Sequence, residues 1–465
     1  MSRPLSSFRS SSRGVAAPGD RGAVLVVALL IMAVLALGLT SYLSMNVNSA
    51  RQAQRGFQQA AAFNLAEAGA EEALWSFNQA NAGAADAWSN WTLLEPAARR
   101  TWSGFDFGSA TGNVKVYVDH RAPSGSTRPT IVALATVSAP GGAEVSKMLE
   151  VSLRRRSRFS AGLMAKDAIV FSGTRASVDS WNSDPDNNPA TAPVPYSSAV
   201  RNDRGSVASV SVGTRAVLVN QADVYGYVYT GGPQPEVGRN GRITGRDTPV
   251  GVNIDPSRVT TDFSATFPDV GAPADGISLA SLGTTLGTEG EATRWRCANI
   301  ALSGRQTLTI LGDVTLILTA GSGARAIDVT GNASIIIPAN SSLTVYVEGD
   351  VLIAGNGIAN DNVRPISCQI YGTNTTASGQ TIHLAGNGAL QSVVYAPNAD
   401  LKINGNGDIM GAAVARSIDL TGNADFHYDE SLEHLDTDMP YGIDRWRELT
   451  TETARASQRG NFSGW

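Results

Sequence analysis

The run AVLVVALLIMAVLALGLTSYL, residues Ala23–Leu43, decides how this 465-residue chain begins to fold. Of its 21 residues, only one Gly, one Thr and one Ser fall outside the hydrophobic set, and no charge occurs between Arg21 and Arg51. An ionised side chain is costly in hydrocarbon, so a charge-free run of about 20 residues predicts a membrane-spanning helix. The residues expected to lie in lipid are Val24, Leu25, Val26, Val27, Leu29, Leu30, Leu35, Leu37 and Leu43.

The charges around this run predict its orientation. Residues 1–22 carry four Arg against one Asp, whereas only Arg51 and Arg55 follow the run closely. By the positive-inside rule, the N-terminus is expected in the cytoplasm and everything after Leu43 on the outer side of the membrane.

The helix is expected to continue beyond the membrane, over residues 23–78 in all. Residues 44–78 contain no Pro and are rich in Ala, Gln, Glu and Leu, which are good helix formers. Apolar residues at helical spacing predict one stripe that packs on protein. That stripe comprises Val47, Phe57, Ala61, Leu65, Ala68 and Trp75.

Two simpler interpretations of this segment are a signal peptide and a generic single-pass anchor. A signal peptide has an apolar core of about 7–15 residues that ends at a small-x-small cleavage site. Here the core is longer, and the helical pattern runs through the candidate cut near Ala50. The anchor remains an alternative.

The junction Asp20-Arg21-Gly22, followed at once by AVLVVALL, resembles the prepilin leader of type IV pilins and pseudopilins. The later NLAEAGAEEAL (64–74) resembles the N-terminal segment of PilX-type minor pilins. The resemblance implies cleavage between Gly22 and Ala23 by a prepilin peptidase, residence in a bacterial inner membrane, and later assembly with other pilin subunits. Major pilins carry Phe and Glu where this chain has Ala23 and Val27, which favours a minor pilin or pseudopilin.

Residues 79–158 are expected to form a small αβ head. Period-two alternation in 114–119, 130–137 and 144–153, with a Gly141-Gly142 turn, predicts an antiparallel meander. Several Trp residues nearby are expected to fill its core, although a carbohydrate platform is an alternative. The Arg-rich stretch 154–160 is taken as a domain boundary.

The rest of the chain is expected to be mostly β. Residues 159–300 alternate short apolar runs with Pro, Asp, Asn and Gly loops. From 301 to 430, short β-rich runs alternate with Gly-Asn pairs at repeats near twenty residues, which predicts a β-solenoid, with a β-sandwich as runner-up. Gly would supply positive-φ corners and Asn would stack in a ladder. Residues 431–465 are expected to form a polar tail that caps the solenoid.

Few residues suggest chemistry. Asp184, Asp186 and Asn188 imitate the start of a calcium loop but lack its later Gly and Glu, so no metal site is assigned. Cys297 and Cys368 form a candidate disulfide, with two buried thiols as the alternative. Other acids and histidines show no catalytic or metal-ligand spacing. These are Asp313, Glu348, Asp350, Asp361, His120, His383, His427 and His434.

The sequence thus predicts an α+β protein with a long N-terminal helix, a small antiparallel sheet and a mostly-β C-terminal domain. The net charge of −5 gives no basic surplus for nucleic acid. No cofactor and no enzyme activity are expected. We expect a structural subunit that is anchored in the membrane and then initiates or caps a pilus or secretion pseudopilus, or attaches it to a surface through an unidentified ligand. The alternatives are an anchored β-solenoid adhesin or scaffold and a membrane-tethered polysaccharide-active enzyme.

Overall fold

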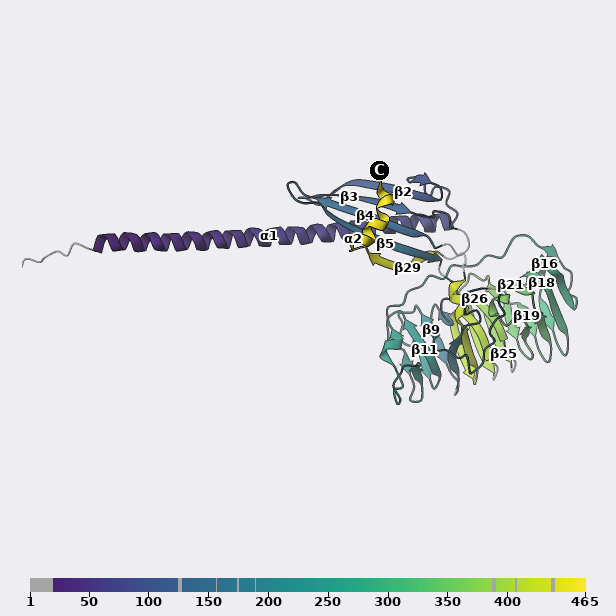
Figure 1. The fold of residues 1–465 in the computed structure, drawn as a ribbon. Helices are drawn as coiled ribbons and strands as arrows, with labels where there is room; N and C mark the ends of the chain where they lie inside the picture. Colours follow the sequence, from purple (N-terminus) through teal and green to yellow (C-terminus); the bar gives the residue numbers. More distant parts are fainter. Residues whose placement is uncertain are drawn as a thin grey trace, which may run out of the picture. The chain divides into compact units, whose positions relative to one another are not determined.

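The computed structural model divides the chain into two compact units (Figure 1). The first unit comprises Met1–Arg154 and Gly442–Trp465, and the second comprises Arg155–Tyr441. The structure describes residues 20–123, 128–155, 157–173, 175–188, 190–386, 390–405, 408–435 and 440–465. The expected boundary in 154–160 therefore agrees with the division into units. Most of the predicted leader, residues 1–19, lies outside the described residues.

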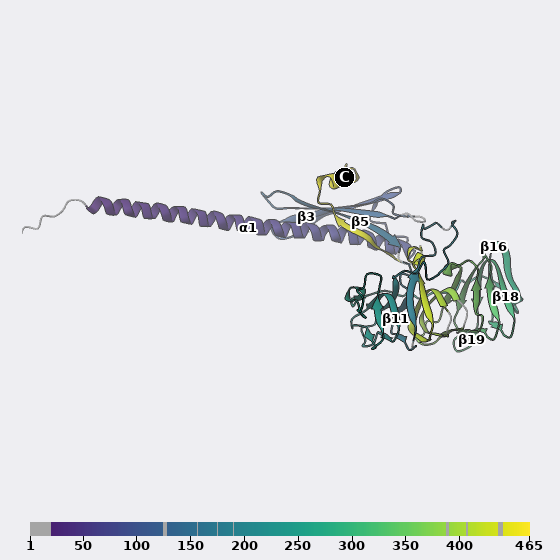
Figure 2. The ribbon, with the colours of Figure 1, turned by 60° about the horizontal axis from the view of Figure 1, so that its bottom comes forward.

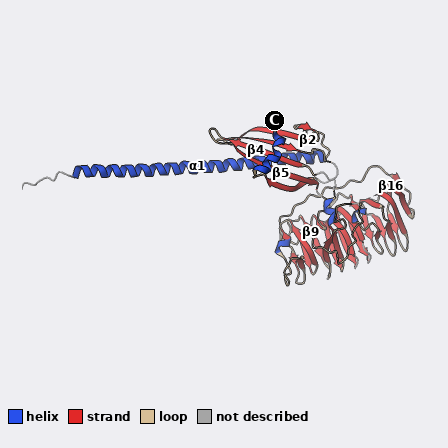
Figure 3. Ribbon diagram, viewed as in Figure 1, coloured by secondary structure: helices blue, strands red, loops and turns tan. Residues whose placement is uncertain are grey.

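Helix α1 spans Asp20–Asn81, 62 residues, which confirms the expected long N-terminal helix (Figure 3). Its apolar N-terminal half is exposed: Leu25 is 64% and Val47 is 49% accessible. This helix is long and apolar enough to cross a membrane, with a mean hydropathy of 2.4 in its most apolar window. An N-terminal helix of this kind is found in membrane anchors and in signal sequences alike.

The C-terminal half of α1 packs on strands β3 and β4 of the first unit through a seam of small residues. The predicted stripe is partly wrong: Ala61 and Leu65 are buried, but Phe57 and Trp75 are about half exposed. Large side chains on the seam would hold the helix away from the sheet, so mainly small ones occupy it. The buried residues are Gln58, Ala61, Ala62, Leu65, Ala66, Gly69, Ala70, Ala73, Ser76 and Phe77.

Gly69 sets how closely α1 approaches the sheet. A Cβ atom added to Gly69 would lie 2.8 Å from Cγ2 of both Val114 and Val116. Gly69→Ala is therefore expected to destabilise the first unit by about 1–3 kcal/mol through overpacking. Gly56→Ala is the matched control, because nothing lies within 4 Å of its added Cβ. Alanine there should stabilise the helix by up to about 1 kcal/mol.

Denaturant unfolding of the full chain in detergent, followed by Trp fluorescence, measures both changes. Six of the eight Trp residues belong to the first unit, so this signal reports mainly on it. Equal shifts of the unfolding midpoint for the two variants would mean that α1 does not pack as closely on β3 as described.

The sheet of the first unit has the order β1-β2-β3-β4-β5-β29. Neighbours from β1 to β5 pair antiparallel, which confirms the predicted meander. Strand β2 was not predicted, because its sequence AARRTWSGFD lacks regular alternation. The strands are β1 (Thr92–Leu94), β2 (Ala97–Asp106), β3 (Thr111–Val118), β4 (Thr130–Ser138), β5 (Val145–Arg155) and β29 (Tyr441–Glu448).

Residues 442–465 belong to the first unit, so the prediction that the whole tail 431–465 caps the other domain is wrong; its first described residues, 431–435, stay with the second unit. Strand β29 pairs with β5 as the sixth strand. Helix α2 (Glu452–Gln458) and the 3-10 turn η4 (Arg459–Phe462) follow it. Val132 and Met148 of the sheet form a buried cluster with Leu449 and Phe462. Burial of these apolar side chains, which the polar composition of the tail obscured, holds the tail on the sheet.

The second unit contains one sheet of 23 strands, β6–β28 (Figures 1 and 2). Its described strand pairs are parallel. Many strands pair with a strand that comes two or three strands later in the chain, as β18 does with β21 and β21 with β24. Burial alternates along these strands, so every second side chain faces one continuous apolar core. The coarse prediction of a mostly-β C-terminal region is confirmed.

The strand bounds of the second unit run along the chain as follows. They are β6 (Leu163–Ala165), β7 (Ile169–Phe171), β8 (Ser177–Trp181), β9 (Gly205–Ser209), β10 (Val217–Asn220), β11 (Asp223–Thr230), β12 (Glu236–Val237), β13 (Arg242–Thr244), β14 (Val259–Thr260), β15 (Ile277–Ser278), β16 (Thr285–Cys297), β17 (Ile300–Leu302), β18 (Thr307–Leu318), β19 (Arg325–Val329), β20 (Ser334–Ile337), β21 (Ser342–Val347), β22 (Asp350–Ile353), β23 (Ile358–Asn360), β24 (Cys368–Gly372), β25 (Thr381–Gly386), β26 (Leu390–Gly405), β27 (Asp408–Gly422) and β28 (Asp425–Asp429). The 3-10 turns are η1 (Pro256–Arg258), η2 (Pro365–Ser367) and η3 (Glu430–His434).

The predicted division between 159–300 and 301–430 is wrong, because the two regions share one sheet. Strand β27 pairs with β6 and β7, and β28 pairs with β8. The first strands of this unit, β6 and β7, therefore lie inside the sheet, and β9, β10 and β11 extend the sheet on one side of them. The chain then continues to β15 and β16, and the strands that follow pair successively until β27 lies beside β6.

Several Gly-Asn pairs form the corners of this sheet, as expected. Gly331 and Gly355 have φ of +70°, and Gly422 has φ of +83°. A Cβ added to Gly355 would lie 1.8 Å from the carbonyl oxygen of Gly331, so the two corners stack directly. Asn356 Nδ2 donates to the Asn332 carbonyl at 3.1 Å, which extends the stack. The Asn residues of the pairs at 386–387 and 405–406 lie outside the described residues.

The candidate disulfide is wrong, because Cys297 and Cys368 are free, buried thiols. Three ladder steps separate their strands, from β16 through β18 and β21 to β24. At about 4.8 Å per step this is about 14 Å, twice the Cα separation that a disulfide tolerates. Burial raises the pKa of both thiols, to about 12 for Cys368.

Candidate functional site

The surface of α1 is the first candidate for function. Gly22 and Ala23 lie two and three residues after its first residue, Asp20. The side chain of Val24 is outside the description, whereas the other expected membrane residues are each more than half exposed. These are Leu25, Val26, Val27, Leu29, Leu30, Leu35, Leu37 and Leu43. This part of the helix is apolar on every side, and its side chains are exposed among the described residues.

A basic groove of about 330 Å³ lies where α1 first meets the sheet. Arg51, Gln54, Arg55 and Gln58 line its helical side. The turn between β4 and β5, residues 139–143, lines the other side. Arg51 and Arg55 are one helical turn apart and exposed, so both guanidinium groups can meet an anionic partner.

An acidic and apolar groove of about 380 Å³ lies further along the helix. Its lining combines Glu67, Ala70, Glu71 and Leu74 of α1 with Val151 of β5 and with Ile443 and Trp446 of β29. Ile443 is 52% and Trp446 41% exposed, so both side chains leave apolar surface open to this groove. The Trp446 ring packs edge-on against Phe63 at 5.6 Å, which fixes it beside the helix.

The expectation that the Trp residues fill the core of the first unit is confirmed for Trp88 and Trp91, whereas Trp75 is about half exposed. Trp88 and Trp91 are 8% and 6% exposed and pack edge-to-face at 5.2 Å. Trp91 Nε1 donates to the Ser76 hydroxyl at 3.1 Å, so the indole is satisfied inside the unit. These two rings leave no open face for the alternative of a carbohydrate platform.

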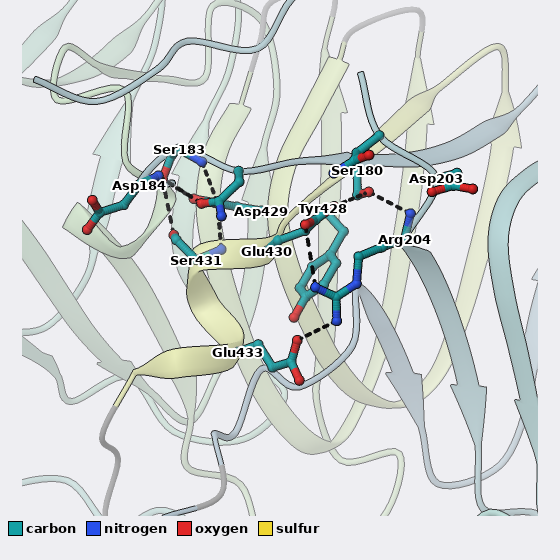
Figure 4. A network of polar contacts seen from close by, with 12 residues as sticks. Ser180, Ser183, Asp184, Asp203, Arg204, Tyr428, Asp429, Glu430, Ser431 and Glu433 are labelled. Carbon is teal, nitrogen blue, oxygen red and sulfur yellow. Dashed lines mark hydrogen bonds and ion pairs between the residues drawn. The ribbon is translucent and has the colours of Figure 1, made fainter. Parts of the chain in front are cut away.

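A buried polar network in the second unit joins β28 and η3 to the segment that follows β8 (Figure 4). Asp429 is fully buried and accepts bonds from the Ser183 amide at 3.0 Å and from its hydroxyl at 2.6 Å. It also accepts from the Ser431 amide at 3.1 Å. Burial raises the pKa of Asp429, although these hydrogen bonds act in the opposite direction.

Two further acids extend this network (Figure 4). Glu430 accepts a bond from the Ser180 hydroxyl at 2.7 Å, and that hydroxyl accepts from the Arg204 amide at 2.8 Å. The Arg204 guanidinium donates to Glu433 at 2.9 Å. The whole network therefore ties β28 and η3 to residues about 250 positions earlier.

His427 and Asp179 form a buried pair at the same junction. The Nδ1 atom of His427 lies 2.5 Å from a carboxylate oxygen of Asp179, whose other oxygen accepts from Tyr196 at 2.9 Å and faces Arg201 at 2.6 Å. Tyr196 stacks on the imidazole at 3.7 Å and covers it. Burial and Asp179 raise the pKa of Tyr196. The Nε2 atom faces Asp408 at 3.9 Å rather than a hydroxyl or thiol, so the described contacts provide no nucleophile.

Four of the acids named from the sequence make structural contacts. Asp184 and Asp186 both accept from the Asn188 amide, at 3.0 and 3.2 Å, as in a turn. Asp313 accepts from Ser342, and Asp350 from the Thr381 amide, both at 2.7 Å. Among the described residues, no group of three or more His, Cys, Asp or Glu could hold a metal ion.

The comparisons with known proteins bear on part of the second unit. Residues 299–435 match a family described as a domain of unknown function (DUF7305). No curated protein matches the chain. A solved structure that resembles it is the DUF3494 domain of an ice-binding protein from Shewanella frigidimarina. The two share 12% identity, with 59% of this chain and 99% of that chain covered and a TM-score of 0.24, which is too low to support an argument.

Proposed function

We propose that this chain is a minor pilin or pseudopilin-like structural subunit that carries a β-solenoid as its distal domain. Its helix would first anchor it in a bacterial inner membrane, with the N-terminus in the cytoplasm. After cleavage it would pack among the helices of other subunits in a pilus or secretion pseudopilus. Initiation, capping or surface attachment is the role proposed for it there.

One observation carries this proposal. A single helix changes from a uniformly exposed apolar surface over residues 25–47 to a seam that is buried on an antiparallel sheet from Gln58 onward. A signal peptide is removed from the mature protein, so a signal peptide is not expected to continue as the same helix into the core of a folded unit. A subunit that is first anchored in lipid and later packs beside other helices needs both parts: an apolar surface that is free to be covered and a second half that is fixed to its own sheet.

The assignment of the second unit as a β-solenoid rests on its strand pairs. Most strands from β16 to β24 pair in parallel with a strand that comes two or three strands later in the chain, which is the pattern that successive coils produce. The corners at Gly331 and Gly355 lie directly against each other, as the corners of two successive solenoid coils would. A β-sandwich is built from antiparallel sheets, which this pairing does not favour.

Processing at Gly22 is the test of this function. Co-expression of the full chain with a prepilin peptidase is expected to remove residues 1–22 and leave a mature chain that begins Ala-Val-Leu. Gly22→Val should abolish this cleavage. Gly38→Val is the matched control, since Gly38 lies in the same helix with nothing within 4 Å of its added Cβ, and it should be processed normally.

Intact mass and N-terminal sequencing measure the outcome. A chain that keeps its leader in every sample would instead indicate a permanently anchored adhesin or scaffold. A new N-terminus near Ala50 would indicate a signal peptide and would contradict the proposal.

A further inference from the structure

Three side chains from separate parts of the second unit meet beside strand β26. Lys166 follows β6, Asn398 lies within β26, and Asp269 belongs to the segment between β14 and β15. The Nζ atom of Lys166 donates to Oδ1 of Asn398 at 2.9 Å. The Nδ2 atom of Asn398 donates to a carboxylate oxygen of Asp269 at 2.8 Å. An amino group, a carboxamide and a carboxylate therefore form one hydrogen-bonded row.

The carboxamide of Asn398 is held in one orientation. Its Nδ2 atom donates a second bond to the Asn374 carbonyl at 3.0 Å. Because both amide hydrogens are bound on that side, Oδ1 is turned toward Lys166. Asn398 is only 9% exposed, which keeps water, the competing nucleophile, away from its carbonyl carbon.

The position of Asp269 is fixed by the same strand that carries Asn398. The Tyr395 hydroxyl donates to the carbonyl of Pro268 at 2.9 Å. Tyr395 and Asn398 both belong to β26, and Pro268 immediately precedes Asp269. Strand β26 therefore places the acid and the amide next to each other.

The acids nearest to this row in sequence are engaged elsewhere. Arg416 of β27 forms ion pairs with both Asp167 and Asp400. An ion pair with either acid would favour the protonated form of a lysine, which is not a nucleophile. The described side-chain bond of the half-buried Lys166 instead goes to Asn398.

We propose that Lys166 and Asn398 form an intramolecular isopeptide bond. The neutral Lys166 amine attacks Cγ of Asn398, so that a Cγ–Nζ bond forms and the Cγ–Nδ2 bond breaks. The proton that the amine gives up moves through Asp269, which already contacts Nδ2, to the departing nitrogen. One ammonia molecule is released. The step exchanges one amide for another, so it needs no oxidant and no co-reactant.

This bond clasps three neighbouring strands at the place where the first strands of the unit meet its last. Strand β26 pairs with β27, and β27 pairs with β6 immediately before Lys166. Lys166 and Asn398 are 232 residues apart, so the bond closes a loop that contains most of the second unit. A cross-link that closes a long loop restricts the unfolded chain, as a disulfide does. The inference does not depend on the proposed function.

The intact mass of the full chain, purified in detergent, tests the bond directly. The mass is expected to be lower than that of the linear chain by one ammonia molecule. Peptide mapping should find a branched peptide in which the Lys166 side chain is joined to that of Asn398. N-terminal sequencing of the same sample fixes the start from which the mass is calculated, so the bond and cleavage at Gly22 are scored separately.

Three variants assign the bond to these residues. Lys166→Arg keeps a positive charge and hydrogen-bond donors but is not expected to form the bond, so it should have the linear mass. Lys402→Arg, at an exposed lysine of β26, is the matched control and should still lack one ammonia. Asp269→Asn keeps both reacting groups and removes the proton carrier, so most of its molecules should stay linear.

A natural chain with the full linear mass would overturn the inference, whatever the variants do. A loss of ammonia that persists in Lys166→Arg would also overturn it, since it would indicate a succinimide at an Asn residue. Complete bond formation in Asp269→Asn would overturn the role given to Asp269. On a denaturing gel the natural chain, closed into a loop, should run ahead of Lys166→Arg, and equal mobility would contradict the bond.

Discussion

Gly226→Ala is expected to destabilise the second unit by at least about 3 kcal/mol, because no side chain fits where β9 and β11 meet. The two strands pair with Gly226 opposite Gly205. A Cβ on Gly226 would lie 1.4 Å from the carbonyl oxygen of Gly205. That neighbour is backbone, so it cannot turn aside as a flexible side chain would, and the strands would have to separate.

Hydrogen exchange of the full chain in detergent, read in peptides that cover β9 and β11, measures this loss of protection. Gly271→Ala serves as the control, because nothing lies within 4 Å of its added Cβ, and its stability should change by less than about 0.5 kcal/mol. Protection unchanged in the Gly226 variant would mean that β9 and β11 do not form the described pair.

Asp429→Ala is expected to cost about 3 kcal/mol, since it leaves buried donors without an acceptor. The lost bonds are those from the amide and hydroxyl of Ser183 and from the Ser431 amide. These bonds connect the end of β28 to the segment that follows β8, so protection should fall in β8 and β28 together. Asp361→Ala, at an exposed position with no described side-chain bond, should leave it unchanged.

The pH dependence gives a second readout of the same group. Burial raises the pKa of Asp429 in the folded state. Its contribution to stability is therefore complete below its unfolded pKa and is lost as the pH rises through its folded pKa. Asp429→Asn keeps an acceptor oxygen without this titration, so its stability should vary less with pH over that window than that of the natural chain.

Local patterns predicted the helix and the meander because their contacts are close in sequence. The charge-free run Ala23–Leu43 and the absence of Pro up to Asn78 suffice to make one long helix. Alternation in 130–137 and 144–153 suffices for two neighbouring strands joined by a turn. The stripe on α1 was predicted from the apolarity of its side chains. The close approach of the helix to the sheet instead leaves room only for small side chains, as at Gly69 and Ala73.

The polar junction of the second unit was not predicted from sequence. His427 and Asp179, like Asp429 and Ser183, lie nearly 250 residues apart, and neither partner has a local pattern that points to the other. Because these Ser, Asp and His side chains are buried, the hydrogen bonds among them hold β28 and η3 against β8 and the segment that follows it.

The sequence by itself determined that this chain has a long apolar helix, a small meander and many short strands with Gly corners, since each depends on residues within a few positions of one another. Only the tertiary structure decided that β27 lies against β6, that the C-terminal strand β29 completes the first sheet, and that Cys297 and Cys368 stay apart. Strand pairing through backbone hydrogen bonds is nearly independent of side-chain identity, so many partners satisfy the same local pattern. The choice among them is made by filling one apolar core without gaps and by pairing every buried polar group, and both conditions involve the whole chain at once.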